Sequence, residues 1–423
     1  MHQKHTLKNG VRIIIEEIPY AHSAVIGLWV RTGSRYENDC NRGVSHFIEH
    51  LLFKGTANRT AKQIAEELET LGGSLNAFTA KEYTCLYARV LAEHLPAAVD
   101  LLTDMFFHSN FAPEDIVKER KVILEEIKMY EDSPEELIHD LFATTVWQKH
   151  ALGYPILGTA NSVQGINEKI VLDYFQEYYT PERVVLAVAG KVQQEEVLAL
   201  LEERYGDWQP GKMNERAGET PVPHAEIVFS KKDTEQVHLC LGTPGLAQGD
   251  DRMYAMMVLN NIIGGGLSSR LFQEIREQRG LVYSIYSYHA SYLDTGLFII
   301  YAGTSPGNVL EVVELSLKEL HRVKTDGITR QELFKTKEQI KGSVLLSMES
   351  TSHRMSRLGR TEICFGRVIT GEEIVAGIRA TKPDEVQQLA RDLFQKTQLT
   401  LTSIGPSDKS CNFEEVREIV QIL

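Results

Sequence analysis

The segment His46-Phe47-Ile48-Glu49-His50 carries the side chains of this sequence best suited to chemistry. If the segment is helical, His46 and His50 lie one turn apart on one face, and both imidazoles project toward the same place. Two histidine nitrogens held in this way are typical ligands of a tetrahedral zinc ion. Glu49 is poorly placed as a further ligand because it adjoins His50, but it is well placed to take a proton from a metal-bound water. A metal-activated water beside a carboxylate base is a typical catalytic arrangement for peptide hydrolysis.

The flanking residues favour a buried helix over a chance match of the motif. Asn41 and Gly43 precede the motif as a helix start, and Gly55 follows as a stop. Apolar residues fill most of the positions between: Val44, Phe47, Ile48, Leu51, Leu52 and Phe53. Two histidines and a glutamate in such a helix would be costly to bury without a strong partner. We therefore expect the helix to present them to a metal ion.

Length and charge limit the classes of protein that this chain can belong to. A chain of 423 residues is too long for one ordinary core and predicts about two to four compact units. Its hydrophobic content of 43% and charged content of 24% are typical of globular proteins. The formal net charge of −13 argues against nucleic acid and against anionic membrane surfaces as main partners.

The sequence predicts a cytoplasmic protein. The N-terminal residues run directly into a strand-like segment at 11–15, without the apolar core of a signal peptide. No apolar run is long enough to span a bilayer. The cysteines are odd in number and have no Cys-x-x-Cys spacing, which indicates reduced thiols rather than disulfides or a cysteine metal site. They are Cys40, Cys85, Cys240, Cys364 and Cys411.

The same order of elements occurs twice along the chain. The corresponding segments are 24–33 and 237–245, 86–107 and 296–323, 113–130 and 329–349, and 184–205 and 399–423. Strands and helices in this order predict an α+β fold, in which an antiparallel-rich sheet packs against helices. An internal duplication would give two domains of similar fold.

The polar segment between the two halves is rich in Pro and Gly and predicts a linker. We expect an N-terminal domain at 1–208, a linker at 209–225 and a C-terminal domain at 226–423. Where the first half has its motif helix, the second half has residues 254–261, which contain no set of metal ligands. Only the N-terminal domain is therefore expected to bind metal.

A zinc hydrolase needs a third protein ligand and an open position for water. The segment 116–127 predicts a helix whose apolar stripe is Ile116, Ile123 and Ile127. Glu119 and Glu126 lie two turns apart on one face of this helix, and either could complete the site. The alternative is an ordinary solvated acidic face.

The inverted motif at 46–50 with a downstream Glu-x6-Glu resembles the inverzincin metallopeptidases. These include pitrilysin, the insulin-degrading enzymes and the β subunit of the mitochondrial processing peptidase, and the chain is most similar to short bacterial relatives of that subunit. The resemblance extends over nearly the whole chain. Its further motifs are 72–79 (GGSLNAFT), 119–126 (ERKVILEE), 269–272 (SRLF) and 280–283 (GLVY).

The resemblance implies a role for each of these residues. It implies one zinc per chain bound by His46, His50 and Glu126, with Glu49 as the general base and Glu119 fixing a ligand imidazole. Arg276 and Tyr283 correspond to a second-domain pair that reaches the substrate, and Asn76, Ala77 and Phe78 to a strand that binds it. The chain has the length of the short members, in which two domains form half of a clamshell and a second chain supplies the other half.

Two of these roles have structural alternatives. Tyr283 suits the stabilisation of an oxyanion, as does Arg276, but residues 281–286 could equally form a strand with packed aromatic side chains. Residues 76–79 would bind extended peptide by main-chain hydrogen bonds if they form an exposed edge strand. The alternative is a strand paired within its own sheet.

We therefore expect a cytoplasmic zinc endopeptidase that cleaves extended or unstructured peptides in an enclosed chamber, as a homodimer or as a heterodimer with a related chain. One alternative is a subunit active only with a separate, metal-free partner chain. A non-catalytic scaffold is the other, although a scaffold has no physical need of the motif.

Overall fold

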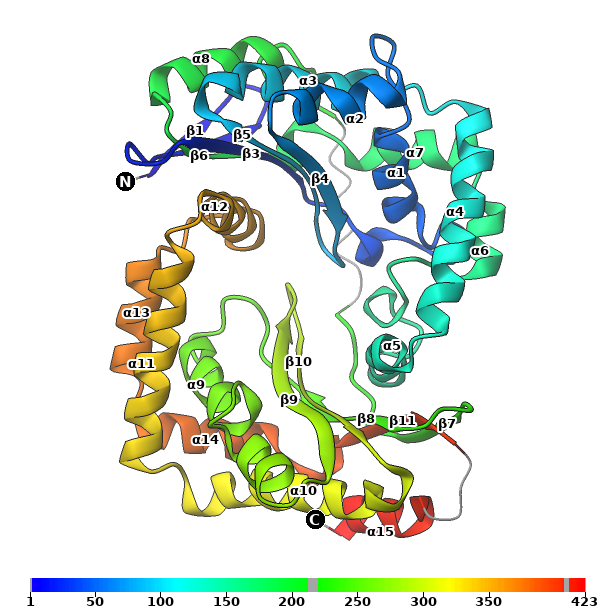
Figure 1. Cartoon of the computed structure of the whole chain (residues 1–423), viewed down its shortest axis with the longest axis vertical. Coiled ribbons are helices and arrows are strands. Elements are labelled where there is room, and N and C mark those ends of the chain that lie inside the picture. The colour runs from blue at the N-terminus through cyan, green and yellow to red at the C-terminus, as the bar shows by residue number, and fades with distance from the viewer. Residues whose placement is uncertain (1, 212–219, 407–410, 423) are drawn as a thin grey trace. The chain divides into compact units, whose positions relative to one another are not determined.

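The computed structural model describes residues 2–211, 220–406 and 411–422, and it has the expected α+β architecture, with two sheets packed against helices (Figure 1). The chain forms two compact units. Unit 1 takes its residues from 1–128, 154–218 and 345–369. Unit 2 takes its residues from 129–153, 219–344 and 370–423.

The six-stranded sheet of unit 1 has the order β1-β2-β6-β3-β5-β4. Its strands are β1 (His2–Thr6), β2 (Arg12–Glu17), β3 (Ser23–Val30), β4 (Ser74–Thr79), β5 (Thr84–Leu91) and β6 (Val184–Gly190). β2 and β6 pair in parallel, and the other neighbours are antiparallel. The central strand β6 is buried at every position, because helices cover both faces of the sheet, and its sequence is accordingly almost wholly apolar.

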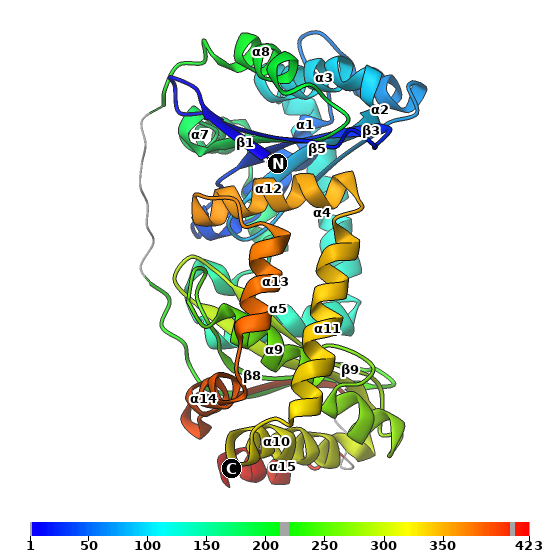
Figure 2. The ribbon, with the colours of Figure 1, turned by 90° about the vertical axis from the view of Figure 1, so that its left-hand side faces the viewer.

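The helices of unit 1 divide between the two faces of this sheet. They are α1 (Val44–Leu52), α2 (Ala61–Thr70), α3 (Leu95–His108), α4 (Pro113–Glu131, which passes into unit 2 at its end), α6 (Ala160–Gly165), α7 (Glu168–Tyr178), α8 (Gln194–Tyr205) and α12 (Thr351–Phe365). Residues of α1, α2, α3, α4, α7 and α8 form one core with alternate residues of the strands. The intervening strand residues, including Trp29, pack against α12, which contacts β2, β3 and β6. Figure 2 shows α12 beside the sheet of unit 1.

Gly359 allows α12 to approach this face closely. A Cβ atom at position 359 would overlap the indole of Trp29 on β3. Glycine in a helix interior normally costs stability relative to alanine, so its presence here reflects the lack of space.

We expect Gly359→Ala to lower the free energy of unfolding by about 1–3 kcal/mol, because overpacking outweighs the gain in helix propensity. Gly342→Ala is the matched control. Gly342 lies on a helix of unit 2, and a Cβ atom there meets nothing within 4 Å, so this change is expected to stabilise by about 0.5–1 kcal/mol. Urea denaturation of both variants measures the two effects, and stabilisation of both would contradict the close packing.

The five-stranded sheet of unit 2 has the order β7-β11-β8-β10-β9. Its strands are β7 (Ile227–Lys231), β8 (Val237–Pro244), β9 (Val282–Ser291), β10 (Gly296–Thr304) and β11 (Thr400–Gly405). Its helices are α5 (Pro134–Val146), α9 (Met253–Gly264), the π-helix η5 (Phe272–Glu277), α10 (Val309–Asp326), α11 (Arg330–Ser347, which passes into unit 1 at its end), α13 (Gly371–Ala380), α14 (Pro383–Leu393) and α15 (Phe413–Ile422). α9, α10, α14 and α15 pack on one face of the sheet, and α5 packs on the other.

The order of strands shows the expected internal duplication. In both sheets the first and last strands of the repeat pair in parallel, as β2 with β6 and β7 with β11. The edge strands β4 and β9 occupy equivalent ends of their sheets. Unit 1 adds β1 at its other edge.

The compact units differ from the expected division at 1–208 and 226–423 in two helices. α5, from the first half of the chain, packs in unit 2, and α12, from the second half, packs in unit 1. Each sheet has a second apolar face that needs a helix, and the repeats exchange the helices that cover these faces. Of the expected linker at 209–225, residues 212–219 lie outside the described residues.

Within the described ranges, no helix has both the length and the apolar character that crossing a membrane requires.

Candidate metal centre

The motif helix α1 begins at Val44, directly after Gly43, as expected. Gly43 has a φ of 90°, in the left-handed region that favours glycine. The buried carboxylate of Glu37 accepts hydrogen bonds from the backbone N–H of Gly43 at 2.7 Å and of Ser45 at 2.9 Å. These bonds satisfy N–H groups at the helix start. Glu37 therefore anchors the helix that carries the motif.

The structure brings His46, His50 and Glu126 together. One ligand atom from each lies within 4.8 Å of the other two. His46 Nε2 is 3.8 Å from Glu126 Oε1, and His50 Nε2 is 3.6 Å from Glu126 Oε2. Ligands about 2.0 Å from a tetrahedral zinc lie about 3.3 Å from one another, so a small contraction would suit this spacing to one ion. The sequence left open whether Glu119 or Glu126 completes the ligand set. In the structure, Glu126 faces the Nε2 atoms of both imidazoles.

The protonation state of His46 suits metal binding. Burial, and then the neighbouring His50, lower the pKa of His46 to about 3. The imidazole is therefore neutral near pH 7, and a neutral nitrogen is the form that binds a metal. Two imidazoles and a carboxylate fit the ligand types of zinc.

Glu119 lies behind the cluster. Its buried carboxylate lies 3.1 Å from His50 Nδ1 through Oε2 and 2.7 Å from Lys54 Nζ through Oε1. A carboxylate at Nδ1 selects the tautomer in which that nitrogen donates and Nε2 is left as the acceptor. Lys54 was not among the predicted site residues, because a lysine four residues after His50 belongs to no motif.

We expect Glu119→Gln to weaken zinc binding by about 10- to 100-fold, as is typical when a partner of a ligand imidazole is lost. The fold should persist, because glutamine has nearly the same volume. Glu125→Gln on the same helix is the control, since Glu125 is exposed and pairs with Lys128 at 2.7 Å. Competition for zinc with a chromogenic chelator measures both affinities, and equal weakening in the two variants would contradict the role of Glu119.

Glu49 lies on α1 between the two histidines and outside the three-residue cluster. The hydroxyl of Thr79 donates a hydrogen bond to Glu49 Oε2 at 2.6 Å. Burial raises the pKa of Glu49 above its usual value, and the Thr79 hydrogen bond and His50 partly oppose this. A carboxylate with a raised pKa is a stronger base than an exposed one.

The segment Asn76, Ala77 and Phe78 lies on β4, the last strand of its sheet. Among the described residues β4 pairs with β5 alone, so the strand is both paired within its sheet and open along its other edge. Asn76 and Phe78 are exposed, whereas Ala77 packs toward the helices. Peptide binding at this edge stays a prediction.

Arg276 and Tyr283 both lie in unit 2. The guanidinium of Arg276 is 4.7 Å from the ring centre of Phe272 within η5. Tyr283 lies on β9, so residues 282–286 do form a strand, but its side chain is 77% exposed rather than packed. The predicted contribution of these two residues to catalysis stays a prediction.

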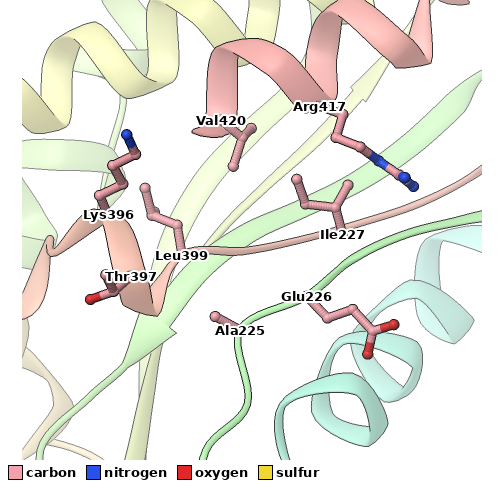
Figure 3. A pocket seen from close by; sticks show the side chains of 8 residues that line it. All are labelled: Ala225, Glu226, Ile227, Lys396, Thr397, Leu399, Arg417 and Val420. Carbon is pink, nitrogen blue, oxygen red and sulfur yellow. The ribbon is translucent and has the colours of Figure 1, made fainter. Parts of the chain in front are cut away.

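Unit 2 also contains a cavity of about 510 Å³, which includes none of the predicted site residues (Figure 3). It mixes apolar and charged side chains. The lining residues are Ala225, Glu226, Ile227, Lys396, Thr397, Leu399, Arg417 and Val420.

A duplicated α+β fold with a His-x-x-Glu-His helix and a downstream glutamate defines a class of metallopeptidase-like proteins. Two family models match this chain: Insulinase (Peptidase family M16) at residues 12–160, and Peptidase M16 inactive domain at residues 165–340. The chain belongs to peptidase family M16. The motif helix and Glu126 lie within the first matched range.

Relatives and solved structures agree with this family. The chain is 46% identical to an uncharacterized zinc protease of Bacillus subtilis, over 96% of this chain and 99% of that protein. It is 41% identical to an uncharacterized zinc protease of Streptomyces coelicolor, over 95% of this chain and 89% of that protein. Its fold is similar to a crystal structure of a protease from Helicobacter pylori, with a TM-score of 0.89, 23% identity and coverage of 96% and 99%. The fold is also similar to a crystal structure of a peptidase M16 inactive domain from Pseudomonas fluorescens. The TM-score is 0.89 at 21% identity, over 96% of this chain and 98% of that chain.

Proposed function

We propose that this chain is a zinc-dependent endopeptidase that cleaves extended or unstructured peptides. The observation that carries the proposal is the convergence of His46, His50 and Glu126 within 4.8 Å, with Glu49 on the same helix as both histidines. The names of the relatives as zinc proteases support the choice of metal.

His46, His50 and Glu126 would hold one zinc ion, which when bound supplies Lewis-acid chemistry that activates water and polarises a peptide carbonyl. Glu49 accepts a proton from the attacking water and then passes it to the leaving amine. Glu119, held by Lys54, keeps Nδ1 of His50 protonated and its Nε2 directed at the ligand cluster.

The edge strand β4 is the proposed binding place for substrate. An extended peptide that pairs with Asn76, Ala77 and Phe78 is recognised mainly through its backbone, so the sequence preference is expected to be loose. Arg276 and Tyr283 of unit 2 are proposed to stabilise the oxyanion, since a guanidinium and a phenol are suitable donors.

We further propose that the protein acts in the cytoplasm, as a homodimer or with a related chain. Light scattering of the purified chain after size exclusion separates these two states, since only a self-associating chain has the mass of a dimer. A monomer that cleaves peptides would remove the need for any partner.

Incubation with a mixture of unstructured peptides tests the function directly. Peptides of about 10–25 residues are long enough to lie along an edge strand. The zinc-loaded chain should produce fragments identifiable by mass spectrometry, and removal of zinc with a chelator should stop their formation. Fragments that persist unchanged after zinc removal would contradict the proposal.

A further inference from the structure

We propose that Thr79 is a positioning residue for Glu49, and that it couples the base to the strand that would bind the peptide. The inference rests on the proposed function, because it concerns the base and the substrate strand of that reaction. It names a residue that the motif at 46–50 does not contain.

The first observation is the hydrogen bond itself. Thr79 is the last residue of β4, and its hydroxyl donates to Glu49 Oε2 at 2.6 Å. This bond engages one oxygen of the carboxylate and leaves Oε1 to take the proton of the attacking water.

The second observation is the direction in which the side chains of β4 point. Successive residues of a strand face opposite sides, and Asn76 and Phe78 are exposed on one face of the sheet. Ala77 and Thr79 face the helices on the other side, where α1 packs against β4. Thr79 therefore reaches Glu49 from a strand that, in the part of the chain that the structure describes, pairs with β5 alone and so has its other edge open to a peptide.

In this arrangement, β4 would position both Glu49 and the bound peptide. A peptide added to β4 takes its register from the main chain of the strand. Since Thr79 belongs to that strand and holds Glu49, the distance from the base to the bound peptide depends on one rigid element. Catalytic groups need positions defined within about 0.5 Å, and a free glutamate side chain has several rotamers.

The residue type fits this role. Threonine is β-branched and stiff at χ1, so its hydroxyl direction is well defined in a strand. Valine has nearly the same shape without the donor, and serine keeps the donor on a less restricted side chain. The pair Thr79→Val and Thr79→Ser therefore separates the hydrogen bond from packing.

The test compares the zinc-loaded full-length variants on one fluorogenic peptide that the wild type cleaves. We expect Thr79→Val to lower kcat by about 10- to 100-fold, because a hydrogen bond to a charged group is lost. KM, zinc content and thermal stability should stay close to those of the wild type. Thr79→Ser should restore kcat to within a few-fold of the wild type. Thr70→Val is the control, since the Thr70 hydroxyl donates instead to the backbone oxygen of Glu66 at 2.7 Å.

An unchanged kcat in Thr79→Val, or equal losses in Thr79→Val and Thr79→Ser, would overturn the inference. A wild type that cleaves no peptide would instead remove the proposed function. Crystal structures of the wild type and Thr79→Val then still test the positioning. The same Glu49 conformation in both would overturn it, and a displaced carboxylate in the variant alone would support it.

Discussion

Glu49→Gln is expected to lower kcat by at least about 100-fold, the lower end of what a general base contributes. The amide has nearly the same size as the carboxylate but cannot accept a proton. Because Glu49 lies outside the ligand cluster, the variant should keep its zinc. Steady-state cleavage of a fluorogenic peptide and metal analysis of the same sample measure both quantities.

The control for this experiment is Glu125→Gln, an exposed glutamate whose change should leave kcat unaltered. Equal activity of the wild type and Glu49→Gln would show a different base or a contaminating protease. A variant without zinc would contradict the placement of Glu49 outside the ligand set.

Glu126→Gln is expected to weaken zinc binding, and the loss of zinc is expected to abolish activity. A lost direct ligand should weaken zinc binding by more than the 10- to 100-fold typical of outer partners such as Glu119. The fold should remain, because the Glu126 side chain is 42% exposed and needs no buried partner. Competition with a chelator measures the affinity, and circular dichroism checks the fold.

The same control serves here, because Glu125 precedes Glu126 on α4 and faces solvent. Full zinc affinity in Glu126→Gln would assign the third ligand elsewhere. Together the two experiments distinguish the roles, since the base variant keeps metal and loses rate, whereas the ligand variant loses metal.

The asymmetry of the duplicated fold has a simple physical reading. The repeats have the same strand order, but α9 of unit 2 is mostly apolar where α1 of unit 1 carries the motif. A mostly apolar helix and a helix with polar motif residues can fill the same place in a core, provided that the polar residues have partners. In unit 1 these partners are Glu119, Glu126 and Thr79.

Local sequence was sufficient for much of the fold and of the candidate site. The motif helix starts after Gly43 as predicted, since a positive φ and a run of apolar residues are local signals. The four-residue spacing of His46 and His50 places them on one face of any helix. The repeated order of elements likewise predicted two sheets of the same topology, because strand and helix periodicities are read directly from the chain.

Only the tertiary structure decided which groups meet across long separations in sequence. The pattern of α4 allowed Glu119 and Glu126 either to face solvent or to face the motif. Packing places Glu119 behind His50 with Lys54, and Glu126 in front of both imidazoles. The hydrogen bond from Thr79 to Glu49 joins residues thirty positions apart and has no signal of its own.

The exchange of α5 and α12 between the units was also beyond the sequence. An amphipathic pattern shows which face of a helix is buried but not which sheet covers it. That choice depends on shape, as where Gly359 lets α12 lie against Trp29. The sequence by itself therefore determined the chemistry available to this protein, because ligand types and helical spacing are local properties. The tertiary structure decided which carboxylate faces the imidazoles and which hydroxyl holds Glu49, because those contacts depend on how distant elements pack.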